Sequence, residues 1–87
     1  MAPLWTRASV AARAHEGREV TLIVDNIVYR LPEIFMSFHP GGSAVLMCHA
    51  GLDATSAFQG AGHSAAARAR LRQFECGRLT GLDVIRL

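Results

Sequence analysis

The chain contains no lysine, so its basic character comes entirely from 9 arginines. Against 7 acidic residues, the formal net charge is only +2 at pH 7. No dense basic run with interleaved aromatic residues occurs, which is the pattern expected of nucleic-acid-binding proteins. We therefore expect no nucleic-acid partner.

Cysteine is also scarce. The 2 cysteines, Cys48 and Cys76, form no C-x-x-C motif. A disulfide between them would need a suitable geometry. We expect instead two reduced thiols in a reducing compartment.

Long apolar runs are missing as well. None approaches the roughly 18 residues of a membrane span, so no transmembrane anchor is expected in this chain. The segment before Glu16 is rich in alanine and arginine and has no acidic residue, which faintly resembles an organellar transit peptide. The simpler interpretation is the first amphipathic helix of the domain. We expect a soluble cytoplasmic monomer, with an organellar location or excision from a larger protein as alternatives.

The length of 87 residues allows one small domain. Of the 51% apolar residues, 14 are alanine, so large core side chains are fewer than the percentage implies. A small core of this kind would be stabilised by a bound cofactor, because the cofactor binds only the folded state.

The first half of the chain predicts a helix and a hairpin. Residues 6–14 are expected to form a short helix capped by Thr6. Two β-branched runs, 20–24 and 27–29, flank the turn signal Asp25-Asn26. Pro32 is expected in the first turn of the next helix. The apolar face of that helix would contain Leu31, Ile34, Phe35 and Phe38.

The second half predicts three more helices. They are expected at residues 43–49, directly after Asp53 as capping residue, and at 65–75. The last would carry Ala67, Leu71 and Phe74 along one stripe and end at Gly77. The tail from Leu79 is expected to form a final strand followed by a loose end.

Two histidines stand in glycine-rich turns: His39-Pro40-Gly41-Gly42, and 24 residues later Gly62-His63-Ser64. Glycine lets the backbone approach a large planar ligand closely, because it has no Cβ. Neutral imidazole is a common metal ligand. Large apolar residues lie near both histidines in the sequence, and a hydrophobic slot with two opposed imidazoles suits an iron porphyrin. These apolar residues are Phe35, Phe38, Val45, Leu46, Phe58, Leu71 and Phe74.

Other interpretations of these residues are weaker. A single histidine in a turn is usually a capping or solvent-exposed residue. A zinc site built from His39, Cys48, His49 and His63 matches no common zinc spacing. Cys48 and His49 are more simply one buried and one exposed helix position. A Cys–His hydrolase would need a third, orienting group, and none is evident.

From Leu4 to Leu79 the sequence resembles the cytochrome b5-like haem-binding domain family. The most specific segment is His39-Pro40-Gly41-Gly42, the signature of that family. Three further segments fall in the order of the family: Val28-Tyr29, the stretch from Ala50 to Phe58, and Gly62-His63-Ser64. Gly77-Arg78-Leu79 resembles its closing segment.

The resemblance implies a small α+β fold in which a short mixed β-sheet forms the base and two helical hairpins form a haem cleft. Residues 4–79 would be the domain and 80–87 a C-terminal tail. His39 and His63 would be the axial ligands of haem b, held noncovalently because no C-x-x-C-H motif occurs. Ser64 stands where the family can bind a haem propionate. The predicted cofactor-binding residues are Phe35, Pro40, Gly41, Val45, Leu46, Phe58, Ser64, Leu71 and Phe74.

The chain departs from the family pattern in three places. Arg30, Leu31 and Pro32 replace the usual Asp, Val and Thr, which changes how the next helix is capped. Ala61 is smaller than the usual Val. The well-known members carry acidic clusters around the haem edge, whereas here the segment 40–63 has one acidic residue and is followed by three arginines at 68, 70 and 72.

The resemblance implies an electron carrier, since two protein ligands leave no iron position for a substrate. The chain would not itself be an enzyme. It would accept single electrons from a flavin-dependent reductase and pass them to an oxidase or desaturase. The alternative is a haem-binding regulatory or sensor module, and a third hypothesis is an interaction domain that binds no haem.

Overall fold

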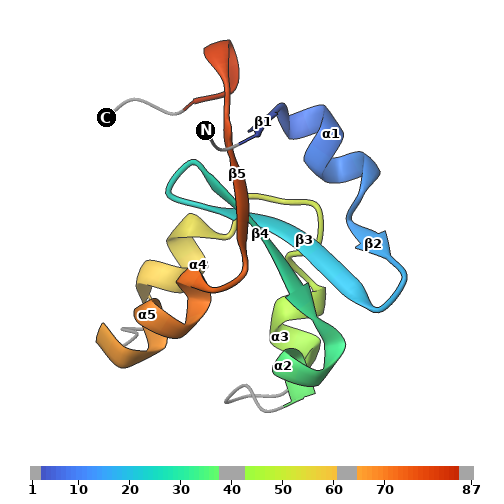
Figure 1. Ribbon diagram of the computed structural model, residues 1–87, viewed down its shortest axis with the longest axis vertical. Coiled ribbons are helices and arrows are strands. Elements are labelled where there is room, and N and C mark those ends of the chain that lie inside the picture. Colours follow the sequence, from blue (N-terminus) through green and yellow to red (C-terminus); the bar gives the residue numbers. More distant parts are fainter. Residues whose placement is uncertain (1–2, 38–42, 61–64, 85–87) are drawn as a thin grey trace.

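The computed structural model describes residues 3–37, 43–60 and 65–84, which form a mixed β-sheet with helices packed against it (Figure 1). The sheet has 5 strands in the order β1-β5-β4-β3-β2. β1 pairs parallel with β5, and the other neighbours are antiparallel. The α+β class and the mixed sheet are as predicted. The strands are β1 (Leu4–Trp5), β2 (His15–Glu16), β3 (Glu19–Val24), β4 (Ile27–Pro32) and β5 (Glu75–Leu79).

The hairpin of β3 and β4 is the centre of the sheet. The predicted turn at Asp25-Asn26 is confirmed, with φ angles of 52° and 65°. Asparagine and aspartate tolerate this left-handed conformation, which matches the twist of the two flanking strands. The turn fixes a register in which Leu22 lies opposite Tyr29 and Val20 lies opposite Leu31.

The start of helix α2 (Glu33–Ser37) differs from the prediction. β4 continues through Leu31 to Pro32, so Pro32 ends a strand instead of beginning a helix. Proline is tolerated at the end of a strand, where its missing N–H is not needed. Leu31 is buried in the sheet and Ile34 is 70% exposed. The predicted helical face that joined both to Phe35 was therefore wrong.

Helix α1 (Arg7–Ala12) begins where the sequence predicts. The hydroxyl of Thr6 accepts a hydrogen bond from the amide of Ser9, and the hydroxyl of Ser9 accepts one from the amide of Thr6. This reciprocal pair satisfies amides that the first helical turn leaves without partners. β2 follows directly, where we expected only the end of the helix.

The remaining helices are α3 (Ser43–Met47), α4 (Thr55–Gly60) and α5 (Ala65–Arg72). α3 and α5 end earlier than predicted. Asp53 accepts a hydrogen bond of 3.0 Å from the amide of Thr55, so its predicted capping role at α4 is confirmed. Within the described residues no helix is long and apolar enough to cross a membrane.

Gly77 does not end a helix as predicted but lies inside β5. A Cβ atom at this position would lie 2.5 Å from the carbonyl oxygen of Pro3 and 2.5 Å from the ring of Trp5. Only glycine lets β1 and its tryptophan pack this closely on β5. β5 ends at Leu79, so the strand predicted from Leu79 onward was also wrong. A short 3-10 helix, Gly81–Asp83, follows instead.

The two faces of the sheet carry two separate cores, because successive side chains of a strand point to opposite faces. One core contains Val10 of α1 with Ile23, Val28 and Leu79. The other faces helices α2 to α5 and includes Val20, Leu22, Val24, Tyr29 and Leu31.

The cysteines are both free, as expected. The prediction of a buried Cys48 and an exposed His49 was wrong, because Cys48 is exposed and His49 is half-buried. α3 already ends at Met47, so helical spacing no longer decides which of the two side chains points inward. The Cys48 sulfur lies 3.3 Å from Nδ1 of His49.

Candidate functional site

The two predicted iron ligands stand in corresponding places in the chain. His39 belongs to the segment 38–42 that joins α2 to α3, and His63 belongs to the segment 61–64 that joins α4 to α5. Both lie outside the described residues, as do Pro40, Gly41 and Ser64 and the side chain of Val45. Their roles in cofactor binding stay predictions.

The other predicted cofactor-binding residues come together in space. Each of the four helices α2 to α5 contributes a side chain to one apolar cluster on the sheet, and Phe74, just after α5, adds another. Leu71 is buried within this cluster, whereas the others are half-buried and pack against it. The five are Phe35, Leu46, Phe58, Leu71 and Phe74.

Tyr29 belongs to the strand floor of this cluster, and sequence analysis did not name it as a site residue. Its side chain is only 5% exposed. Burial raises the pKa of Tyr29, and the nearby carboxylates of Glu75 and Asp25 add to this effect, while Arg72 opposes it. The phenol therefore stays neutral at physiological pH and packs as an apolar group with a polar tip. The signal for its burial was available in the sequence, because the two-residue turn at Asp25-Asn26 places Tyr29 opposite Leu22.

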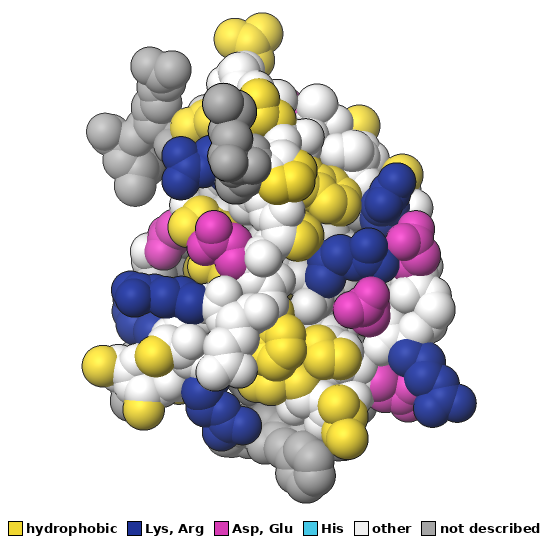
Figure 2. All heavy atoms as spheres, in the orientation of Figure 1, with side chains coloured by type: hydrophobic (Ala, Val, Ile, Leu, Met, Phe, Trp, Pro, Cys, Tyr) yellow, Lys and Arg dark blue, Asp and Glu magenta, His cyan; other side chains and the backbone are white. Residues whose placement is uncertain are grey.

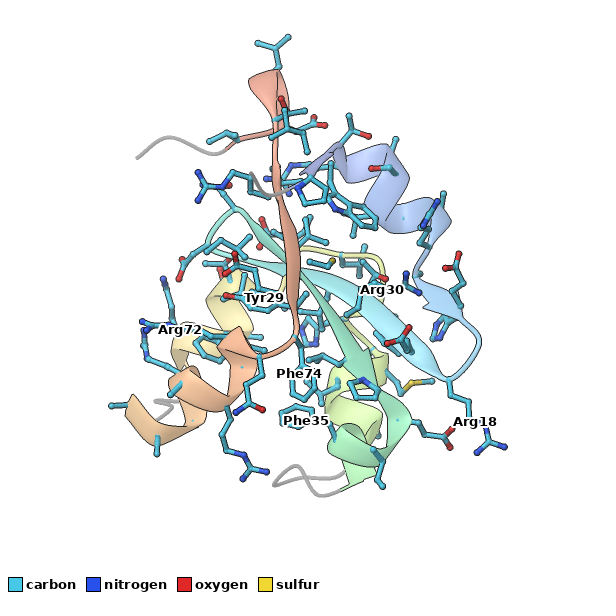
Figure 3. The ribbon with its side chains drawn as sticks, in the orientation of Figure 1. Arg18, Tyr29, Arg30, Phe35, Arg72 and Phe74 are labelled. Carbon is cyan, nitrogen blue, oxygen red and sulfur yellow. The ribbon has the colours of Figure 1, made fainter. Side chains whose placement is uncertain are left out.

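The aromatic side chains of the two helical pairs touch each other. The ring centroids of Phe35 in α2 and Phe74 after α5 are 4.8 Å apart with an interplanar angle of 56°. Figure 3 shows the two rings side by side between α5 and the pair α2 and α3. A tilted pair at this distance is a favourable arrangement for two aromatic quadrupoles.

Backbone hydrogen bonds fix both of these rings to the sheet. The amide of Glu33 donates to the carbonyl of Arg18 at 2.7 Å, which places the first turn of α2 beside the β2–β3 connection. The amide of Arg30 in β4 donates to the carbonyl of Phe74 at 3.0 Å. The positions of the rings thus follow from the strands and not only from side-chain packing.

The chain between α3 and α4 is bonded to β3 along the part of its edge that β2 does not reach. The amide of Gly51 donates to the carbonyl of Thr21 at 2.6 Å, and the amide of Ala54 donates to the carbonyl of Ile23 at 2.7 Å. Gly51 has a φ of 75°, and a Cβ there would lie 2.7 Å from Cβ of Ala14. This glycine therefore permits the close approach that sets where α3 ends and α4 begins.

Asp53 ties the same segment to α1. Its carboxylate accepts hydrogen bonds from Thr55 and lies 3.0 Å from the guanidinium of Arg7. Burial alone would raise the pKa of Asp53, but the bonds from Thr55 together with Arg7 outweigh it and hold the pKa below its usual value. Arg7 also binds the carbonyl of Asp83, so one ion pair connects three distant parts of the chain.

Two arginines of α5 cover rings of the apolar cluster. The guanidinium of Arg68 lies 5.4 Å from the ring centroid of Phe58, and that of Arg70 lies 6.0 Å from that of Phe35. Figure 2 shows a group of hydrophobic side chains on the lower part of one face of the molecule, bordered by both basic and acidic side chains. Sequence analysis noted the arginines but did not place them on these rings.

These residues fit a large, flat, apolar ligand. The half-buried phenylalanines and Leu46 supply apolar surface from both helical pairs. Haem is a ligand of this kind, since its macrocycle is flat and apolar.

Comparison with known proteins agrees with this chemistry. The chain matches, over residues 6–80, the family described as the cytochrome b5-like heme/steroid binding domain. The chain therefore belongs to the cytochrome b5-like domain family. The match covers strands β2 to β5 and all four helices around the apolar cluster.

The chain is also similar to curated proteins named cytochrome b5. Cytochrome b5 type B of Mus musculus is 38% identical over 92% of this chain and 54% of its own length. Cytochrome b5 of Musca domestica is 40% identical over 86% of this chain and 54% of its own length. The chain thus spans about half the length of these relatives.

Solved structures show the same fold. Cytochrome b558 of Ectothiorhodospira vacuolata, described as a prokaryotic homologue of cytochrome b5, aligns with a TM-score of 0.76 at 25% identity, covering 91% of this chain and all of that one. Cytochrome b5 of Ostreococcus tauri virus 2 aligns with a TM-score of 0.70 at 26% identity, covering 87% of this chain and 95% of that one. The comparisons together support haem b as the cofactor of this domain.

Proposed function

We propose that this domain is an electron carrier whose haem b iron is ligated on its two faces by His39 and His63. The observation that carries the proposal is the apolar cluster of α2 to α5, because it collects half-buried aromatic side chains from both helical pairs. Each histidine belongs to the connection within one of these pairs, so the chain order supports one ligand from each side.

The remaining predicted residues have supporting roles in this proposal. Phe35, Val45, Leu46, Phe58, Leu71 and Phe74 would contact the macrocycle and exclude water, which lowers the local dielectric. Pro40 and Gly41 would shape the turn that presents His39, and Ser64 would bind a propionate. We assign residues 4–79 to the domain and 80–87 to its tail.

Electron transfer is the chemistry that such a site favours. Haem, when bound, supplies an iron that changes between two oxidation states. Two protein imidazoles on the iron would leave no coordination position for a substrate, so the domain would act as a carrier and not as an enzyme. The donor would be a flavin-dependent reductase and the acceptor an oxidase or desaturase, with the domain acting as a monomer in the cytoplasm.

The decisive experiment is an absorption spectrum of the purified, haem-loaded chain, oxidised and then reduced. We expect a six-coordinate, bis-imidazole spectrum that does not respond to CO. His39→Ala and His63→Ala should each lose this spectrum or the haem itself. His15→Ala is the matched control, because His15 is exposed in β2, and it should leave the spectrum unchanged.

Two results would contradict the proposal. If both His39→Ala and His63→Ala kept full haem binding with an unchanged spectrum, the ligands would be other residues. Rapid CO or NO binding by the native protein, with linked changes in partner affinity, would instead favour a sensor or regulatory module.

A further inference from the structure

Helix α5 is the most basic element among the described residues. It carries Arg68, Arg70 and Arg72 and no acidic residue, and all three side chains are exposed. Among the described residues, no carboxylate forms a salt bridge with any of them. Because Arg68 and Arg72 are four residues apart, their charges repel each other on one side of the helix.

Two of these charges are held at the apolar cluster. Arg68 lies over Phe58 of α4 and Arg70 over Phe35 of α2, so the guanidinium groups stand beside both helical pairs. A cation–π contact restrains an arginine but does not cancel its charge. The positive groups are therefore partly ordered before any partner arrives, which reduces the entropy lost when an interface forms.

The surroundings add little opposing charge. α3 and α4 contain no charged residue, and α2 contains only Glu33, at its first position. Asp53 is already paired with Arg7. Asp25 and Glu75 lie close enough to Tyr29 to raise its pKa, and Arg72, at the C-terminal end of α5, opposes them there.

We propose that the α5 arginines form a docking surface for an acidic electron-transfer protein, which places carboxylates on Arg68, Arg70 and Arg72. This proposal rests on the proposed function, since it assigns the charge of the partner of the same site. Charge complementarity raises the rate of encounter and selects partners more than it adds affinity, which suits a transient electron-transfer contact. Carboxylates of the partner would also relieve the repulsion between Arg68 and Arg72.

The test measures how salt changes the rate of electron transfer to small charged oxidants. The reduced, haem-loaded protein gives one electron to hexacyanoferrate(III), an anion, or to hexaammineruthenium(III), a cation. Rates are compared for the native chain, for R68Q/R70Q/R72Q, and for R13Q/R18Q/R78Q. The second triple variant loses the same total charge from exposed arginines outside α5 and is the matched control.

For the native chain and the control we expect the anion rate to fall by about tenfold as ionic strength rises from 10 mM to 500 mM. We expect the cation rate to rise. In R68Q/R70Q/R72Q the salt dependence of the anion rate should largely disappear. Poly-L-aspartate, as an acidic polypeptide probe, should slow the anion reaction of the native chain and the control but not that of the α5 variant.

Several outcomes would overturn the docking proposal alone. These are equal salt dependence in both triple variants, or poly-L-aspartate inhibition that survives in R68Q/R70Q/R72Q. Loss of haem from that variant would assign the arginines to holding the cofactor. Binding of the native chain, but not of the α5 variant, to vesicles of phosphatidylcholine and phosphatidylserine at 150 mM salt would assign the surface to a membrane. Absence of the bis-imidazole spectrum from the native chain would instead overturn the proposed function, and this proposal with it.

Discussion

Asp53 shows how much of the architecture depends on one carboxylate. It caps α4 through Thr55 and pairs with Arg7, whose guanidinium also reaches Asp83. The side chain of Asp53 is only 22% exposed, so these bonds are partly shielded from water. A neutral residue at this position would leave Arg7 without its charged partner.

Asp53→Asn should lower the free energy of unfolding by about 1–2 kcal/mol at pH 7, because a hydrogen bond to a charged group contributes about 1.5–3 kcal/mol and this ion pair is partly screened by solvent. The folded pKa of Asp53 lies below its unfolded value, which is near 3.9. Its contribution is therefore complete above that unfolded value and is lost as the pH falls through the folded pKa. Urea denaturation at pH 7, 5 and 3 should show the difference between native and variant protein shrinking toward low pH.

Asp25→Asn is the control for this series. Asp25 is exposed, and asparagine tolerates its positive φ equally well. Its effect should stay within about 0.5 kcal/mol at each pH. A loss for Asp53→Asn that is as large at pH 3 as at pH 7 would show that packing, and not the ionised carboxylate, supplies the stability.

Single residues also mark where sequence reasoning succeeded. Thr6, Asp53 and the pair Asp25-Asn26 were predicted correctly, because caps and tight turns depend on side chains a few residues apart. Ile34 was misplaced, because its apolar character alone could not reveal that α2 turns this position outward. The arginines on Phe35 and Phe58 depend on contacts between separate helices, which no local pattern encodes.

Among the elements, α2 and α5 are connected by the contact between Phe35 and Phe74. Because both rings are half-buried, Phe35→Ala should cost about 1–3 kcal/mol, less than a fully buried phenylalanine would. A double-mutant cycle with Phe74→Ala should give a coupling energy of about 0.5–1.5 kcal/mol. Both quantities follow from denaturant unfolding monitored by circular dichroism.

Ile34→Ala is the matched control within α2, because the neighbouring Ile34 is 70% exposed. We expect a change of less than about 0.5 kcal/mol. If the Phe35 and Phe74 substitutions were simply additive, the two rings would not be energetically linked.

Element types were more predictable than element ends. The hairpin and the helices were recognised from apolar periodicity, but the boundary between β4 and α2 was not. An apolar residue such as Leu31 can be buried equally well in a strand or in a helix. Pro32 is allowed both at the end of a strand and in the first helical turn. The boundary is decided by the pairing of Leu31 with Val20, which depends on the whole sheet.

At the scale of the molecule, the two cores differ in how well they are enclosed. Val10, Ile23, Val28 and Leu79 are 0–3% exposed and the buried members of the second core 1–9%, while α4, which packs on the second core, contains no buried side chain. Local opening requires least free energy where few apolar contacts are broken. The core of α1 and the sheet is therefore expected to be the more stable part.

Hydrogen exchange followed by NMR should show this difference. In protein prepared without haem, amides of β3 and β4 should exchange slowly and those of α4 rapidly. Added haemin should slow exchange in α4 most, because a ligand that binds only the closed form suppresses local opening. Exchange in α4 that is as slow as in β3 before haemin is added would contradict this expectation.

The order of the strands could not be predicted from the sequence. β1 and β5 lie at opposite ends of the chain. β1 has only two residues, and β5 contains a glycine, so neither shows the alternation of apolar and polar residues that marks a typical strand. Their pairing depends on the fit between Trp5 and Gly77, which becomes visible only when both are placed. The family resemblance supplied the architecture that local patterns left open.

The position of the short strand β1 at the edge of the sheet, beside β5, also affects how the domain can be joined to other polypeptides. Both ends of the described chain lie at the side of the sheet away from α2 to α5 (Figure 1). A segment fused before Pro3 or after Val84 would emerge there, leaving the α5 surface uncovered. A tether at either end of the described residues would therefore leave the proposed docking surface on α5 accessible to a partner.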